Sequence, residues 1–80
     1  MTSETEIQVF ITKLISDEIK INISNIDPDA SFQELGLDSI NSMFLLEQIE
    51  NEYQLSLPPL NFWDYPTIRT FSGLIAQKLL

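Results

Sequence analysis

The sequence predicts an all-α fold: a small antiparallel bundle of three main helices plus one short helix, with a long loop between the first two main helices. Apolar residues recur at helical spacing in three separate segments, and no segment shows the apolar–polar alternation of a strand. A hydrophobic content of 44% is ample for a core, and 80 residues suffice for one. We therefore expect residues 1–80 to form a single domain.

The first helix is predicted over residues 4–20. Either Thr2 or Ser3 is suited to cap its start, and Glu4 and Glu6 are well placed against the positive end of the helix dipole. Its apolar stripe consists of Ile7, Phe10, Ile11, Leu14, Ile15 and Ile19.

A long loop is predicted over residues 21–37. Asparagine, aspartate and serine side chains that favour turns are frequent there, and Pro28 excludes a regular helix. Apolar residues are nevertheless scattered through the segment: Ile23, Ile26, Phe32, Leu35 and Leu37. A loop of this length is expected to pack down across the helices or to be functional.

The second helix is predicted to start at Asp38 or Ser39 and to run to Tyr53. It has two apolar faces, although so small a domain can bury only one of them in its own core. At 100° per residue the core face is Ser42, Leu45, Leu46, Ile49 and Tyr53. The opposite face holds Ile40, Met43 and Phe44, together with Glu47 and Asn51. Either the long loop covers this second face, or the face is a surface for docking a partner.

Residues 55–59 are predicted to end the second helix and turn the chain, because two prolines close the segment. The aromatic residues Phe62, Trp63 and Tyr65 follow, with one short helical turn. Thr67 is the expected N-cap of the last helix. The apolar stripe of that helix is Ile68, Phe71, Leu74, Ile75 and Leu79, and Gly73 is expected to permit close helix packing.

Composition excludes several classes of function. Twelve acidic against four basic residues give a net charge of −8, which repels nucleic acid and anionic membranes. That charge either steers the chain toward basic protein surfaces or only keeps it soluble. With no cysteine, nothing argues for an oxidising compartment, and we find neither a membrane span nor a signal peptide. We therefore expect a cytoplasmic protein.

An enzyme is not expected. Serine catalysis needs a base to take the hydroxyl proton, and the chain has no histidine. The lysines of the predicted helices are more suited to solvation than to catalysis. The only glycines are Gly36 and Gly73, so there is no phosphate-binding loop, and we expect no catalytic residue and no metal site.

Ser39 is the residue with the most chemical character. As part of an isolated Asp-Ser pair it has an ordinary interpretation, which is a helix cap or the residue after a cap. In the alternative, it is an attachment point, since a negatively charged group at a helix start is favoured by free backbone amides and by the dipole.

The segment from Glu34 to Ile40, Glu-Leu-Gly-Leu-Asp-Ser-Ile, resembles the phosphopantetheine attachment motif of acyl and peptidyl carrier proteins. The resemblance covers nearly the whole chain. Residues 29–32 are similar to the family's loop before the motif, residues 45–53 to its second helix, and Leu57-Pro58 to the following turn. Residues 62–68, Phe-Trp-Asp-Tyr-Pro-Thr-Ile, resemble the segment that leads into the last helix in polyketide and nonribosomal peptide carriers.

The resemblance implies that Ser39 accepts 4′-phosphopantetheine from coenzyme A through a phosphopantetheinyl transferase, with Asp38 in support. The thiol of that arm would hold an acyl or aminoacyl group as a thioester. A loading enzyme and a downstream synthase or transferase would be the other partners of a monomeric carrier. The partner-binding surface implied by the resemblance is Leu37, Ile40, Met43, Phe44 and Glu47.

The second helix departs from the strongly acidic helix of fatty-acid carriers, because Asn41 and Phe44 occupy positions expected to be exposed. This difference favours a carrier in polyketide or peptide natural-product biosynthesis. The short chain favours a discrete carrier, with a domain of a larger synthase as the alternative. The alternatives are a fatty-acid carrier, a D-alanyl carrier and, in a different class, an unmodified helical module that binds a partner helix.

Overall fold

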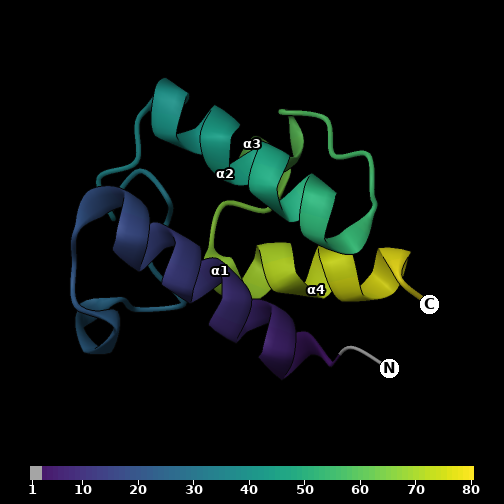
Figure 1. Cartoon of the computed structure of the whole chain (residues 1–80), viewed down its shortest axis with the longest axis horizontal. Helices are drawn as coiled ribbons and strands as arrows, with labels where there is room; N and C mark the ends of the chain where they lie inside the picture. The colour runs from purple at the N-terminus through teal and green to yellow at the C-terminus, as the bar shows by residue number, and fades with distance from the viewer. Residues whose placement is uncertain (1–2) are drawn as a thin grey trace.

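The structure is a computed structural model that describes residues 3–80. It has three main helices, α1 (Glu4–Ile19), α2 (Ser39–Tyr53) and α4 (Ile68–Lys78), and a short helix α3 (Asn61–Asp64) in the connection between α2 and α4. α1 is antiparallel to α2 and α4 (Figure 1). The predicted fold class is confirmed, including the long loop between α1 and α2. A single 3₁₀ turn in that loop, η1 (Ile23–Asn25), was not expected from the sequence.

α1 begins as predicted, because Ser3 is its N-cap and the Ser3 hydroxyl oxygen accepts a hydrogen bond from the amide of Glu6 at 3.1 Å. The alternative cap, Thr2, lies outside the described residues. The helix ends one residue before the predicted boundary, since Lys20 adopts a left-handed conformation with φ of 58°. Its apolar stripe is in the predicted phase, and the fully buried members are Ile7, Ile11 and Ile15.

The long loop packs against the helices, as expected. Its buried side chains are Ile26, Phe32 and Leu37. Its backbone is hydrogen-bonded to the segment before α4, since the amide of Phe32 donates to the carbonyl oxygen of Pro66 at 2.8 Å. Arg69 of α4 also forms an ion pair with Asp29, and its hydrogen bond holds the pKa of that carboxyl below the ordinary value.

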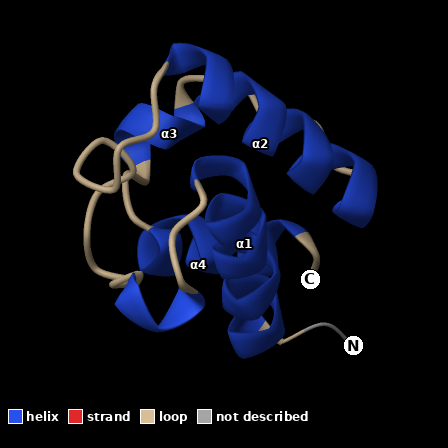
Figure 2. Cartoon of the chain, turned by 60° about the vertical axis from the view of Figure 1, so that its left-hand side comes forward, coloured by secondary structure: helices blue, strands red, loops and turns tan. Residues whose placement is uncertain are grey.

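α2 lies across α1 and α4 (Figure 2). The centre of its predicted core face is confirmed by the burial of Leu45, Leu46 and Ile49, whereas Ser42 and Tyr53 are only half-buried at its edges. On the opposite face, Ile40 is 79% exposed, Met43 56% and Phe44 45%. The alternative in which the loop covers this face is therefore wrong.

An aromatic cluster joins α3, α4 and the loop. The rings of Phe62 and Phe71 stack with centroids 4.9 Å apart, and Phe32 meets both rings edge to face. α4 begins at the predicted cap, since Thr67 accepts from the amide of Thr70 in a capping box.

Two sequence expectations for α4 are wrong. Leu74, which was expected in the core, is only half-buried. Ser72 is fully buried instead, because it lies four residues after Ile68 and three before Ile75 on the buried stripe. Within the described part of the chain, no backbone lies close to Gly73: a Cβ added there would lie 3.4 Å from the side-chain oxygen of Glu4, an ordinary contact. Close helix packing therefore does not require this glycine.

Ser72→Ala is expected to stabilise the protein by about 1 kcal/mol, because the buried Ser72 hydroxyl has no hydrogen-bond partner among residues 3–80. Chemical denaturation measures the free energy of unfolding of both proteins. The matched control is Ser16→Ala, which removes a half-buried hydroxyl that donates to the carbonyl oxygen of Ile21 and is expected to destabilise. A loss of stability in Ser72→Ala would contradict the prediction.

Candidate functional site

The chain enters α2 through an ordered turn. The amide of Ser31 donates to the carboxylate of Glu34 at 2.9 Å, and the amide of Glu34 donates to the hydroxyl of Ser31 at 3.0 Å. Hydrogen bonding of the Glu34 carboxylate to the backbone amide and side chain of Ser31 holds the pKa of Glu34 below its ordinary value. Gly36 adopts a φ of 95°, in the left-handed region that favours glycine. The amide of Leu37 then donates a hydrogen bond to the carbonyl oxygen of Phe32. The segment before the helix is thus a hydrogen-bonded turn.

Asp38, not Ser39, is the N-cap of α2. Its carboxylate accepts from the amide of Asn41 at 2.8 Å, and the side-chain oxygen of Asn41 accepts from the amide of Asp38 at 3.3 Å. Ser39 is therefore the first helical residue, and it is exposed. Capping does not occupy its hydroxyl, which lies at the positive end of the helix dipole.

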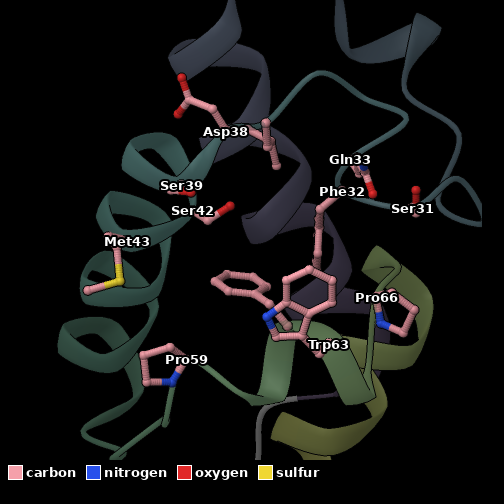
Figure 3. Close-up of a pocket in the computed structure, with 12 residues that line it drawn as sticks. Ser31, Phe32, Gln33, Asp38, Ser39, Ser42, Met43, Pro59, Trp63 and Pro66 are labelled. Carbon is pink, nitrogen blue, oxygen red and sulfur yellow. The ribbon is translucent and has the colours of Figure 1, made fainter.

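A cavity of about 480 Å³ lies beside Ser39, between the start of α2, the loop and α3. Ser39 and Ser42 contribute polar groups from α2, and Phe32, Phe62 and Trp63 contribute aromatic rings. Figure 3 shows the Ser42 hydroxyl directed toward the space between α2 and the indole of Trp63. The site thus combines an accessible hydroxyl with a largely apolar recess.

The predicted partner-binding residues do not all share one environment. Ile40, Met43, Phe44 and Glu47 are exposed on α2, as expected. The prediction that Leu37 belongs to the partner-binding surface is wrong. Only 8% of Leu37 is exposed, because it packs in the core just before the start of α2.

Three further features escaped the sequence reasoning. Leu60 and Trp63 are also exposed apolar residues, and Trp63 is 79% exposed although it lies in a predicted aromatic cluster. Asn41 is half-buried rather than exposed, and its side chain contacts α1. The two prolines before Leu60 were a usable signal, since a chain that turns there leaves its next residues near the surface.

Within residues 3–80, no helix has both the length and the apolar character needed to cross a membrane.

The fold and the site together define a small helical domain that displays a serine at the start of its second main helix, next to an apolar recess. The family model described as "Phosphopantetheine attachment site" matches residues 9–75. The chain belongs to this family, whose members carry covalently attached 4′-phosphopantetheine.

Curated relatives are polyketide synthases. The chain is 31% identical over 85 residues to polyketide synthase PksL of Bacillus subtilis (strain 168), which covers 96% of this chain. It is 35% identical over 68 residues to the non-reducing polyketide synthase phnA of Penicillium herquei, which covers 85% of this chain. The chain spans only 2% of the first relative and 3% of the second.

Solved structures share the fold. A free-standing peptidyl carrier protein from an uncharacterized secondary metabolic pathway of Acinetobacter baumannii matches with a TM-score of 0.93 and 31% identity, covering 98% of each chain. The HMG-ACPI domain from the CurA module of Lyngbya majuscula matches with a TM-score of 0.88 and 34% identity, covering 96% of this chain and 78% of that one. This chain is therefore a carrier protein of the phosphopantetheine-attachment type.

The residues at the start of α2 fit such a group. The hydroxyl of Ser39 is exposed, the helix terminus favours the negative charge of a phosphodiester, and the adjoining cavity has space for part of a flexible arm.

Proposed function

We propose that residues 1–80 act as one carrier domain whose Ser39 accepts 4′-phosphopantetheine from coenzyme A. The carrier holds an acyl or aminoacyl group for partner enzymes in polyketide or peptide natural-product biosynthesis. The observation that carries this proposal is the position of Ser39, exposed as the first residue of α2 and directly after the capping Asp38, within the residues matched by the family model.

The bound group supplies a terminal thiol that holds the cargo as a thioester. The chain's own residues attach and present it. The Ser39 oxygen would form a bond to the phosphorus next to the pantetheine while the phosphoanhydride bond of coenzyme A breaks, so that adenosine 3′,5′-bisphosphate leaves and the hydroxyl proton passes to the transferase or to solvent. The N-terminus of α2 favours the negative charge of the resulting phosphodiester. Asp38 supports the site by capping the helix, which defines where Ser39 stands. In this proposal the chain itself catalyses no step.

The exposed face of α2 is the proposed contact surface for the partners, namely a phosphopantetheinyl transferase, a loading enzyme and a downstream synthase or transferase. Its members are Ile40, Met43, Phe44 and Glu47. Leu37 is left out of this surface, because it is buried. The carrier is proposed to act as a monomer.

The pathway assignment is supported by the relatives, which are polyketide synthases, and by one structural neighbour, which is a free-standing peptidyl carrier protein. Fatty-acid and D-alanyl carriers would use the same attachment serine and differ in cargo. Loading the modified chain separately with malonyl, L-aminoacyl and D-alanyl groups by enzymes specific for each would separate a polyketide or fatty-acid cargo from a peptide cargo and from a D-alanyl cargo.

The test is intact-mass measurement after incubation with coenzyme A and a phosphopantetheinyl transferase of broad specificity. We expect a single phosphopantetheine increment on the wild-type chain and none on Ser39→Ala. The matched control is Ser42→Ala, which removes a hydroxyl one turn later on the wall of the same cavity and is expected to keep the increment. If the folded wild-type protein gained no increment, the unmodified interaction module would replace the carrier proposal.

A further inference from the structure

The first turn of α2, which bears Ser39, has little core packing of its own. The buried residues of this helix, Leu45, Leu46 and Ile49, all lie later in its sequence, whereas Ser39 and Ile40 are exposed. One side of the turn also borders the cavity. Hydrophobic burial therefore anchors the middle of α2 and the preceding Leu37, but not the turn between them.

A hydrogen bond from α1 reaches this turn. The side-chain nitrogen of Asn41 donates to the carboxylate of Glu18 at 2.8 Å, across 23 residues of sequence and in a half-buried position. The same Asn41 side chain accepts from the amide of Asp38, and its backbone amide donates to the Asp38 carboxylate. Asn41 thus connects α1 to Asp38, the residue directly before Ser39.

The residue type at position 41 matters for this connection. The asparagine side chain has one acceptor and one donor group, and here the acceptor completes the capping box while the donor meets a carboxylate. An aspartate would preserve the acceptor for the cap but would set a second carboxylate against Glu18, with no proton to share. Helix capping alone does not need the amide, whereas the bond to α1 does.

We propose that Asn41 and Glu18 are positioning residues that hold the first turn of α2 against α1 and so present the Ser39 hydroxyl in the orientation needed for its modification. The inference rests on the proposed function of Ser39. It also gives Asn41 a role within the domain instead of on the partner surface.

Asn41→Asp separates this role from capping and from docking. An acidic residue in the first turn is favourable for the helix dipole, so capping alone predicts an unchanged or improved melting temperature and unchanged kinetics. Loss of the bond to Glu18 instead predicts a fall of about tenfold in kcat for phosphopantetheinyl transfer, the effect of losing one charge-assisted hydrogen bond. The KM for the carrier should stay near the wild-type value, because Ile40, Met43 and Phe44 still meet the transferase.

The rescue variant is Asn41→Asp combined with Glu18→Gln. The glutamine amide donates to the aspartate carboxylate, which restores the bond with donor and acceptor exchanged. We expect kcat to recover in the double variant. The amide resonance of Ser39, measured without transferase, should shift in Asn41→Asp and return in the double variant. The matched control for added charge on α2 is Gln48→Glu, the same change of amide to carboxylate at a half-buried position two turns later and outside the proposed partner surface.

Failure of the two proposals would be distinguishable. If the wild-type chain gained no mass increment, the assignment of Ser39 would fail, while the resonance shifts would still report on the bond between the helices. If the wild-type chain were modified but Asn41→Asp kept the wild-type kcat, or if the double variant did not recover, the positioning role would be overturned. A rise in KM with kcat unchanged would likewise overturn it and make Asn41 a docking residue.

Discussion

Phe71→Ala is expected to lower the free energy of unfolding by about 3–5 kcal/mol, as truncation of a buried phenylalanine does. Phe71 is fully buried, its ring stacks on Phe62 at 4.9 Å, and it meets Phe32 edge to face at 5.8 Å. The Phe71 ring of α4 therefore packs against both α3 and the long loop. An 80-residue domain has a total stability of roughly 4–12 kcal/mol, so this one change would remove a large part of it.

Urea denaturation followed by circular dichroism measures the effect. The matched control is Trp63→Ala, which truncates a larger aromatic ring that is mostly exposed and is expected to cost less than about 1 kcal/mol. A similar loss in both variants would show that the aromatic cluster is not packed as described. Because Phe32 and Phe62 also line the cavity beside Ser39, Phe71→Ala should disturb that recess as well.

Phe44→Glu is expected to reduce loading of the modified carrier by its cognate enzyme at least about tenfold, the effect of losing one important apolar contact at an interface. The melting temperature should stay nearly unchanged, because Phe44 belongs to the exposed face of α2 and not to the core. A partner with a basic surface would be attracted, not repelled, by the added carboxylate. A loss of loading would therefore reflect the missing apolar contact.

Val9→Glu is the matched control for this variant. Val9 is also an exposed apolar residue, but it lies on α1 and outside the proposed partner surface, so the substitution should leave loading unchanged. Equal losses in the two variants would indicate a general effect of charge instead of a docking site on α2. A large drop in the stability of Phe44→Glu would show that its ring supports the core.

Much of the fold was predictable because its signals are local. Ser3 and Thr67 cap their helices through bonds to residues three positions away, and the stripe of α1 depends only on the 3.6-residue period. The attachment motif was recognisable for the same reason, since the Asp38 cap, the turn at Gly36 and the exposed Ser39 lie within four consecutive residues.

The errors arose where distant segments decide burial. Leu37 was expected on the partner surface beside Ile40, but the packed loop carries it into the core. On α4, Ser72 and Leu74 differ by about 200° around the helix, and only the placement of α1 and α2 decided that the serine would be buried.

The sequence by itself determined the three main helices, the Thr67 cap and the serine at the start of α2, because each depends on residues within one or two turns of one another. For α1 and α2 it left two neighbouring residues as candidate caps, and the structure selected Ser3 and Asp38. The tertiary structure alone decided that Trp63 and Ser39 border one cavity, that Leu37 is buried, and that Asn41 bonds to Glu18. These features join residues far apart in the sequence or depend on which faces meet. Their geometry follows from how three helices and a loop share one core, which no local pattern encodes.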